Sequence, residues 1–308
     1  MSTLWAFPGQ GAQQPGMLQA LPDATVVHDC LEQASATLGE DVRLLDSAEA
    51  LQGTRAVQLC LLVAGVAASR LLIERGHRPE YVAGLSIGAY AAAVVAEALD
   101  FADALRLVAL RGELMQRAYP AGYGMTAILG LDQSSVERLL DDAEGPLYLA
   151  NINAENQLVI AGSDAAMAQV AERARALGAA AVRRLAMSVP SHCELLDAPA
   201  RELAAAFAGV ALHVPRARYL SSSSARVIRE PQRLRDDLAF NMSRRVDWQA
   251  TLVTAYERGV RLHLELPPGG VLTGLARRVF ELGQAVAFAG ARLDTLDAML
   301  RQEVSLDR

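Results

Sequence analysis

The stretch Gly84-Leu85-Ser86-Ile87-Gly88 constrains this chain most, because it joins a strand-like segment to a helical one. Tyr81 to Ala83 is a short apolar run, and residues 89–98 are rich in alanine. A serine at the apex of such a turn requires strained backbone geometry, and the flanking glycines remove Cβ atoms that would collide there. The serine would also lie at a helix N-terminus, where free N–H groups favour negative charge. The pattern predicts a nucleophilic serine, and its alternative is a glycine-flanked turn without chemistry.

Composition narrows the class of protein. The 308 residues can bury a full core, and 52% hydrophobic with 21% charged residues is typical of a globular chain. The net charge of −6 gives no support to nucleic-acid binding, and all 29 basic residues are arginine, which excludes chemistry that depends on lysine. No segment resembles a signal peptide or an uninterrupted apolar span of about 18 residues. The three cysteines lack metal-ligand spacing, and their odd number favours a reducing compartment. We therefore expect a soluble, cytoplasmic α/β protein with no membrane segment and no metal site.

The order of strand and helix patterns predicts a large α/β domain interrupted by a small one. Strands are expected near residues 4–7, 81–83, 218–223 and 261–266, with apolar helices such as 56–74 between them. Residues 125–186 instead follow a β-α-β-β-α-β order, which is typical of a ferredoxin-like unit. We assign residues 1–121 and 189–308 to the large domain and residues 122–188 to the inserted domain.

Arg111 stands out in a helical pattern that begins near Asp100. Its neighbours three and four positions away are all apolar: Leu107, Val108, Leu114 and Met115. A guanidinium on a buried face costs several kcal/mol unless an anion meets it. The anion could be a protein carboxylate, which is the more common arrangement, or the carboxylate of a ligand.

His192 is the histidine best placed for catalysis, in the stretch Ser191-His192-Cys193 before an amphipathic helical pattern. We expect Ser191 to cap that helix and His192 to lie in its first turn, where the helix dipole disfavours protonation. A neutral imidazole is what a general base requires. The alternative is a surface histidine at a helix start.

Five motifs occur together in a fixed order. They are Phe7-Pro8-Gly9-Gln10-Gly11, Gly84 to Gly88, Arg111 within residues 110–116, Ser188 to His192, and Pro268 to Leu275. In this order the chain resembles the malonyl-CoA:acyl-carrier-protein transacylases over residues 4–290. The resemblance implies an α/β-hydrolase-like large domain with a parallel central sheet and a ferredoxin-like insert.

The resemblance also implies roles for single residues. Ser86 would be the nucleophile and His192 its base, while backbone N–H groups of Gln10 and Ile87 would form the oxyanion hole. Arg111 would bind the free malonyl carboxylate, since a bidentate pair suits a planar anion in a dry pocket. The substrates implied are malonyl-CoA and the phosphopantetheine-type thiol of an acyl carrier protein, with no permanently bound cofactor.

The chain departs from the fatty-acid members of that family at three positions. Where they commonly have His before the nucleophile and Glu three residues after it, this chain has Leu85 and Ala89. A family glutamine near the base falls on Asn241, which we expect to bind substrate. The sequence Leu85 to Ala89 is more similar to the transacylase subunit of bacterial malonate decarboxylase. We therefore expect a role in malonate decarboxylation, with fatty-acid or polyketide synthesis as the alternative.

Two other classes remain open. A serine esterase or thioesterase shares Gly-x-Ser-x-Gly, but it usually has an acidic residue between the serine and a late histidine. A non-catalytic scaffold that binds acyl carriers is the second. Arginines crowd residues 226–245, and this region is either a solvated face, the default interpretation, or a surface that attracts an acidic partner such as the carrier protein. Other malonate decarboxylase subunits are further possible partners if the chain serves malonate decarboxylation.

Overall fold

The computed structural model describes residues 2–119, 121–187 and 189–305. Its larger sheet has six strands in the spatial order β11 (Gln284–Ala287), β10 (Val260–Glu265), β1 (Ser2–Phe7), β2 (Tyr81–Gly84), β7 (Arg218–Leu220) and β8 (Val227–Ile228). All neighbouring pairs run parallel except β7 and β8. Both faces of this sheet are covered, so its central strands read as nearly continuous apolar runs.

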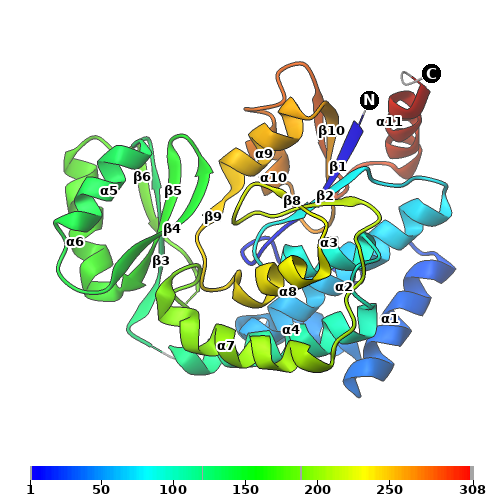
Figure 1. Ribbon diagram of the computed structural model, residues 1–308, viewed down its shortest axis with the longest axis horizontal. Coiled ribbons are helices and arrows are strands. Elements are labelled where there is room, and N and C mark those ends of the chain that lie inside the picture. The colour runs from blue at the N-terminus through cyan, green and yellow to red at the C-terminus, as the bar shows by residue number, and fades with distance from the viewer. Residues whose placement is uncertain (1, 120, 188, 306–308) are drawn as a thin grey trace.

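The smaller sheet has the spatial order β6 (Ala181–Arg184), β3 (Tyr123–Leu129), β5 (Gln157–Ser163), β4 (Leu147–Ala154) and β9 (Val246–Asp247). Neighbouring strands are antiparallel except β4 and β9. With α5 (Gln133–Asp141) and α6 (Asp164–Ala176), the first four strands follow the predicted β-α-β-β-α-β order. Figure 1 shows this unit as a separate green body beside the larger sheet.

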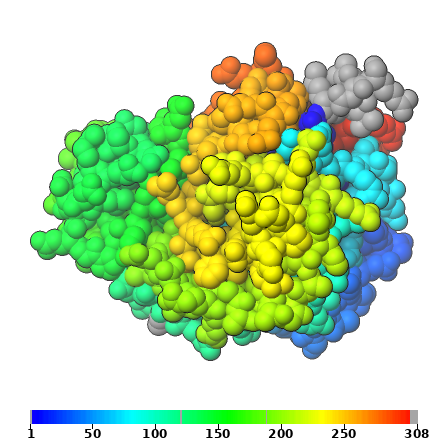
Figure 2. Space-filling model, in the orientation of Figure 1, coloured from blue at the N-terminus to red at the C-terminus, as the bar shows by residue number. Residues whose placement is uncertain are grey.

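Strand β9 was not predicted as part of the small sheet. Its residues 246–247 belong to the segment assigned to the large domain, but they pair with Asn151 and Ile152 of β4. Strand β9 and the helix that follows it, α9 (Trp248–Glu257), therefore lie against the small unit, as the space-filling view also shows (Figure 2). The domain boundaries 1–121, 122–188 and 189–308 remain a prediction, and residue 188 lies outside the described residues.

Helices cover the two faces of the larger sheet unequally. The helices outside the small unit are α1 (Thr25–Leu38), α2 (Thr54–Glu74), α3 (Gly88–Val95), α4 (Phe101–Ala118), α7 (Asp197–Ala206), α8 (Pro231–Phe240), α9 (Trp248–Glu257), α10 (Val271–Ala276) and α11 (Leu293–Ser305). Buried residues of α1 to α4, α7, α8 and α11 share one apolar cluster, whereas α9 and α10 contribute to the cluster on the opposite face.

Helix α2 is central to the larger cluster. By length and composition it could cross a membrane, although the sequence has no uninterrupted apolar run of that length. In the fold, 89% of its most apolar window is buried inside the protein. This burial is typical of a core helix in a globular protein.

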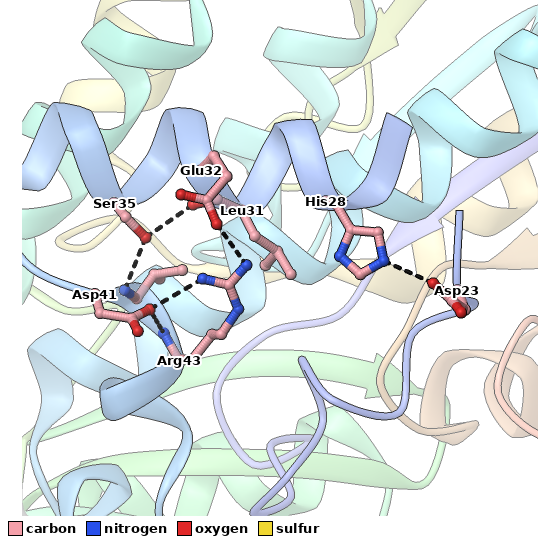
Figure 3. A network of polar contacts seen from close by, with 8 residues as sticks. Asp23, His28, Leu31, Glu32, Ser35, Asp41 and Arg43 are labelled. Atoms are coloured by element: carbon pink, nitrogen blue, oxygen red, sulfur yellow. Dashed lines mark hydrogen bonds and ion pairs between the residues drawn. The ribbon is translucent and has the colours of Figure 1, made fainter. Parts of the chain in front are cut away.

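A polar network at the surface connects α1 to the segment after it (Figure 3). The Arg43 guanidinium donates to Glu32 Oε1 at 2.8 Å and to Asp41 Oδ1 at 3.3 Å, and His28 Nε2 lies 2.7 Å from Asp23 Oδ1. Exposed ion pairs of this kind contribute about 0–1 kcal/mol each. None of these residues lines the pocket described below, so we assign the network to the fold and not to the site.

Candidate active site

Ser86 lies at the sharp turn between β2 and α3, with a φ of 55°. The two flanking glycines are required by contact with neighbouring backbone. A Cβ on Gly84 would lie 2.0 Å from the carbonyl carbon of Gly88, and a Cβ on Gly88 would lie 2.2 Å from the Phe7 carbonyl oxygen. A non-glycine residue at positive φ is strained, and such strain is often found at functional sites. The predicted strand–serine–helix geometry is therefore confirmed, including its physical reason.

Arg111 of α4 is completely buried and reaches this serine. Its guanidinium donates to Ser86 Oγ at 3.2 Å, to Gln58 Oε1 at 2.7 Å and to Asn241 Oδ1 at 3.1 Å. All three acceptors are neutral, and Nε has no hydrogen-bond partner among the residues that the structure describes. Among the described residues, no carboxylate lies within 4.0 Å of this guanidinium. Burial lowers the pKa of Arg111 to about 10. Of the two predicted anions, the protein carboxylate is thus not found, and the cation remains without a counter-charge.

His192 lies in a loop, and the prediction that it starts a helix is wrong. Its φ is 65°, and the next helical segments begin at Glu194 (a 3-10 turn) and at Asp197. The His192 N–H donates to the Met242 carbonyl at 2.7 Å, which directs the chain away from helical hydrogen bonding. Ser191 is not a cap, and its buried hydroxyl has no hydrogen-bond partner within the described part of the chain.

The His192 side chain is nevertheless a neutral base. Its Nδ1 lies 2.8 Å from the Asn241 carbonyl oxygen and 3.2 Å from that of Arg244. A carbonyl can only accept, so Nδ1 carries the proton and Nε2 keeps its lone pair. Burial, followed by the charge of Arg111, lowers the pKa of His192 to about 4. These two causes replace the helix dipole that the sequence suggested.

Ser86, Arg111 and His192 line one pocket of about 230 Å³. Gln10 and Ile87 line it as well. No acceptor for the backbone N–H of Gln10 or Ile87 is found within the described residues, so both groups are free to meet a ligand oxygen. No hydrogen bond joins His192 to Ser86 in the part of the chain that the structure describes. Such catalytic contacts are often long before substrate binds.

Asn241 is placed differently from our expectation. It does not belong to the residues lining the pocket, and it is 1% exposed. Its side chain accepts from Arg111 and donates to the Ser86 carbonyl oxygen at 3.1 Å, while its own carbonyl accepts from His192. Asn241 therefore contacts the backbone of Ser86 and the side chains of Arg111 and His192 from behind the pocket, and its expected role in binding substrate stays a prediction.

Gln58 was not identified from the sequence. It lies in α2, is 1% exposed, and lines the pocket. Its Oε1 accepts from Arg111, and its Nε2 lies 3.3 Å from Met115 Sδ. The feature of the sequence that could have identified Gln58 is that it is a lone carboxamide among the apolar residues of a core helix. Within the described residues, no group of three or more His, Cys, Asp or Glu is arranged to hold a metal ion.

A strained serine, a neutral buried imidazole and free backbone N–H groups at one pocket define a serine acyltransferase or hydrolase site. Comparisons with known proteins decide between these classes. Residues 4–299 match the acyl transferase domain family. The malonyl CoA-acyl carrier protein transacylase of Haemophilus influenzae is 38% identical over 290 residues, covering 91% of this chain and 93% of the relative. That of Escherichia coli strain K12 is 36% identical over 285 residues, covering 90% and 92%.

Solved structures agree with the sequence relatives. The fold matches an acyl carrier protein S-malonyltransferase from Vibrio cholerae with a TM-score of 0.91 and 34% identity, over 97% of this chain and 100% of the other. It also matches a malonyl-transacylase solved with its type II PKS acyl-carrier protein, with a TM-score of 0.92 and 35% identity, over 98% and 100%. The chain belongs to the malonyl-CoA:acyl-carrier-protein transacylase family.

Proposed function

We propose that this protein moves a malonyl group from malonyl-CoA to the phosphopantetheine-type thiol of an acyl carrier protein. The observation that carries the proposal is the buried charge of Arg111, which lies 3.2 Å from Ser86 Oγ and meets no carboxylate among the described residues. A ligand carboxylate at this position would supply the missing anion through charge-assisted hydrogen bonds. An acyl group with a free carboxylate, such as malonyl, fits this requirement.

The proposed reaction has two halves that use the same groups. His192 Nε2 takes the proton from Ser86 Oγ as the oxygen attacks the thioester carbonyl, and the N–H groups of Gln10 and Ile87 stabilise the oxyanion. The CoA thiol leaves with the proton from His192. The carrier thiol then attacks the malonyl-serine ester, again with His192 as base, and Ser86 is restored.

The pathway is a narrower question. The names of the relatives support our alternative, a malonyl transacylase of fatty-acid or polyketide synthesis, better than the malonate decarboxylase role expected from the sequence. The case for malonate decarboxylase rests on Leu85, Ile87 and Ala89. Leu85 lines the pocket beside the nucleophile, and Ala89 is buried. The two positions that are commonly His and Glu in the fatty-acid members are therefore apolar in this chain. Other decarboxylase subunits would be partners only on that narrower proposal.

Several companion expectations also remain proposals. They are a cytoplasmic location, transient docking of an acidic carrier, and the description of the fold as hydrolase-like with a ferredoxin-like insert. Against a serine esterase or thioesterase stands the environment of His192. Its Nδ1 partners are two backbone carbonyls, whereas such hydrolases usually orient the histidine with an acidic side chain.

The test mixes the protein with labelled malonyl-CoA and candidate carrier proteins. We expect a malonyl adduct on Ser86, seen by intact mass spectrometry, followed by carrier-dependent loss of the label to one carrier. Ser86→Ala should form no adduct. Steady hydrolysis of p-nitrophenyl esters without transfer to any carrier would favour the esterase class instead.

A further inference from the structure

Glu265 is a buried carboxylate that the proposed reaction does not use. It lies at the end of β10 and is 0% exposed. Among the described residues it has no ion-pair partner, and its Oε1 has no hydrogen bond. A buried carboxylate without a cation is costly, and an apolar residue of similar size would avoid that cost. A carboxylate at this position therefore calls for a specific explanation.

The other oxygen of Glu265 holds the start of α10. Oε2 accepts from the Thr273 backbone N–H at 2.6 Å and from Thr273 Oγ1 at 2.7 Å. Gly270, the residue before α10, offers no side-chain cap, so Glu265 satisfies one N–H group, that of Thr273, which the short helix leaves free. The first turn of α10 is thus fixed to β10 by one carboxylate.

That first turn forms part of the substrate pocket. Val271, Leu272 and Leu275, which we call the α10 wall, line the same pocket as Ser86 and Arg111. Val271 is 56% exposed, although it is a large apolar residue, which places the wall at the mouth of the pocket.

The connection continues to the loop that carries Gln10. Glu265 pairs with Ala6 of β1, the strand from which that loop leaves. The turn before α10 also approaches the loop, since a Cβ on Gly269 would lie 3.7 Å from the Ala12 Cβ. Glu265 therefore connects the α10 wall to β1 and to the loop that carries Gln10.

We propose that Glu265 is a positioning residue that holds the α10 wall at the mouth of the pocket and thereby sets how tightly the thioester arm of the acyl donor is bound. The inference rests on the proposed function, because it takes the pocket to hold a thioester. Glu265 touches no reacting atom, so the chemical step at Ser86 should depend on it little.

The test measures the KM and kcat of Ser86 acylation by malonyl-CoA in three variants. Glu265→Leu should raise KM about tenfold and change kcat less than about threefold, since a displaced wall weakens donor binding more than chemistry. Thr273→Val, which removes only the hydroxyl contact, should raise KM about threefold. Glu265→Gln keeps an acceptor oxygen and the side-chain shape, and should keep KM within about twofold of the original protein.

Asp46→Leu is the matched control. Asp46 is also a buried carboxylate that accepts backbone N–H groups, those of Met17 and Leu18, but it does not line the pocket. This variant should melt at a lower temperature with KM unchanged. An equal rise in KM for Asp46→Leu would attribute the effect to general destabilisation and overturn the proposal.

The remaining outcomes of the experiment also test the proposal. An unchanged KM in folded Glu265→Leu and Thr273→Val would overturn the proposal, and if the first does not fold, the second decides alone. If the unsubstituted protein forms no malonyl adduct, the proposed function fails by itself. The α10 wall is then tested through the KM for acetyl-CoA, which has the same thioester arm, with the same expected order of variants.

Discussion

At the scale of single residues, the site is governed by one uncompensated charge. Arg111 has neutral hydrogen-bond partners that fix its direction, Gln58 and Asn241, but no described residue neutralises it. Neutral acceptors orient a guanidinium without cancelling its charge, so the attraction for a ligand anion is preserved. The same charge acts on the base, because it disfavours protonation of His192.

Replacing Gln58 by Glu should place a carboxylate beside Arg111 and supply the missing anion. The Gln58 oxygen already lies 2.7 Å from the guanidinium, so the new ion pair should form without rearrangement. We expect acylation of Ser86 by malonyl-CoA to slow about 10- to 100-fold, corresponding to about 1.5–3 kcal/mol for a charged hydrogen bond, with little change for acetyl-CoA. Gln58→Met, which is similar in size but uncharged, should slow malonyl transfer less. An equal loss in the two variants would contradict the charge explanation.

The low pKa of His192 predicts an unusual pH profile. Because the imidazole is neutral above a pKa of about 4, the rate of acylation should stay level from about pH 5 to pH 8 and fall only in stronger acid. An exposed histidine would instead lose activity near about pH 6.5. Arg111→Ala removes a positive charge that lowers this pKa, so its acid limb should move to higher pH. Single-turnover acylation measured across pH gives both profiles. Acid limbs at the same pH in the two proteins would contradict the claim that the charge of Arg111 lowers the pKa of His192.

The sequence could predict the identity of the reactive residues better than their surroundings. Ser86 and Arg111 could be identified as candidate site residues from the sequence, because a glycine-flanked serine after a strand and a cation on an apolar helix face are both unusual. The loop conformation of His192 was not readable, since it depends on the Met242 carbonyl, about fifty residues away. The position of Asn241 behind the pocket, and the part played by Gln58, likewise follow only from contacts between distant segments.

At the scale of elements, the turn from β2 to α3 is the most constrained feature. The Leu85 N–H donates to the Phe7 carbonyl at 3.0 Å, and Gly88 lies against the same carbonyl group. Ser86, the proposed nucleophile, is therefore fixed relative to β1, the strand that leads to Gln10.

Gly88→Ala should be strongly destabilising. The added methyl group would lie 2.2 Å from the Phe7 carbonyl oxygen, which belongs to a central strand and cannot move freely. We expect a loss of about 1–3 kcal/mol in the free energy of unfolding, as for overpacked cores, measured by chemical denaturation. Gly209→Ala is the control, since a Cβ there meets nothing within 4 Å. A Gly88→Ala protein as stable as the control would show that this turn is less rigid than described.

At the scale of the whole molecule, the last helix is anchored to a segment more than two hundred residues earlier. The buried Asp297 of α11 accepts hydrogen bonds from Arg75 and, at 2.9 Å, from His77. The hydrogen bond from Arg75 is the main cause that lowers the pKa of Asp297 to about 2. The first described strand, β1, and the last described helix, α11, lie side by side on one side of the molecule (Figure 1).

Asp297→Asn should lower stability in a pH-dependent way. A depressed carboxyl pKa stabilises the fold above the unfolded value of about 3.9, and this contribution is lost as pH falls toward 2. We expect Asp297→Asn to lose about 2 kcal/mol at pH 7 and nearly nothing near about pH 2. Asp294→Asn is the control, because this carboxylate is 83% exposed and 3.8 Å from Arg75. A loss independent of pH would point to altered packing and not to ionisation.

The overall arrangement was predictable to the extent that it follows local periodicity. The alternating strands and helices, and the β-α-β-β-α-β order of the insert, follow from the periodicity of short segments. The structure has these elements with small shifts at their ends. The pairing of β9 with β4 was not predictable, because a two-residue strand carries no periodic signal and its partner lies about a hundred residues away.

The most direct test of the account is the ratio of the rates at which malonyl-CoA and acetyl-CoA acylate Ser86. Arg111→Ala is compared with the original protein, and Arg106→Ala, an exposed arginine of the same helix, serves as control. The account predicts that Arg111→Ala slows malonyl transfer about 100-fold or more, changes acetyl transfer little, and leaves a ratio that Arg106→Ala does not alter. Equal slowing of both acyl groups, with the ratio unchanged, would contradict the claim that Arg111 receives the substrate carboxylate.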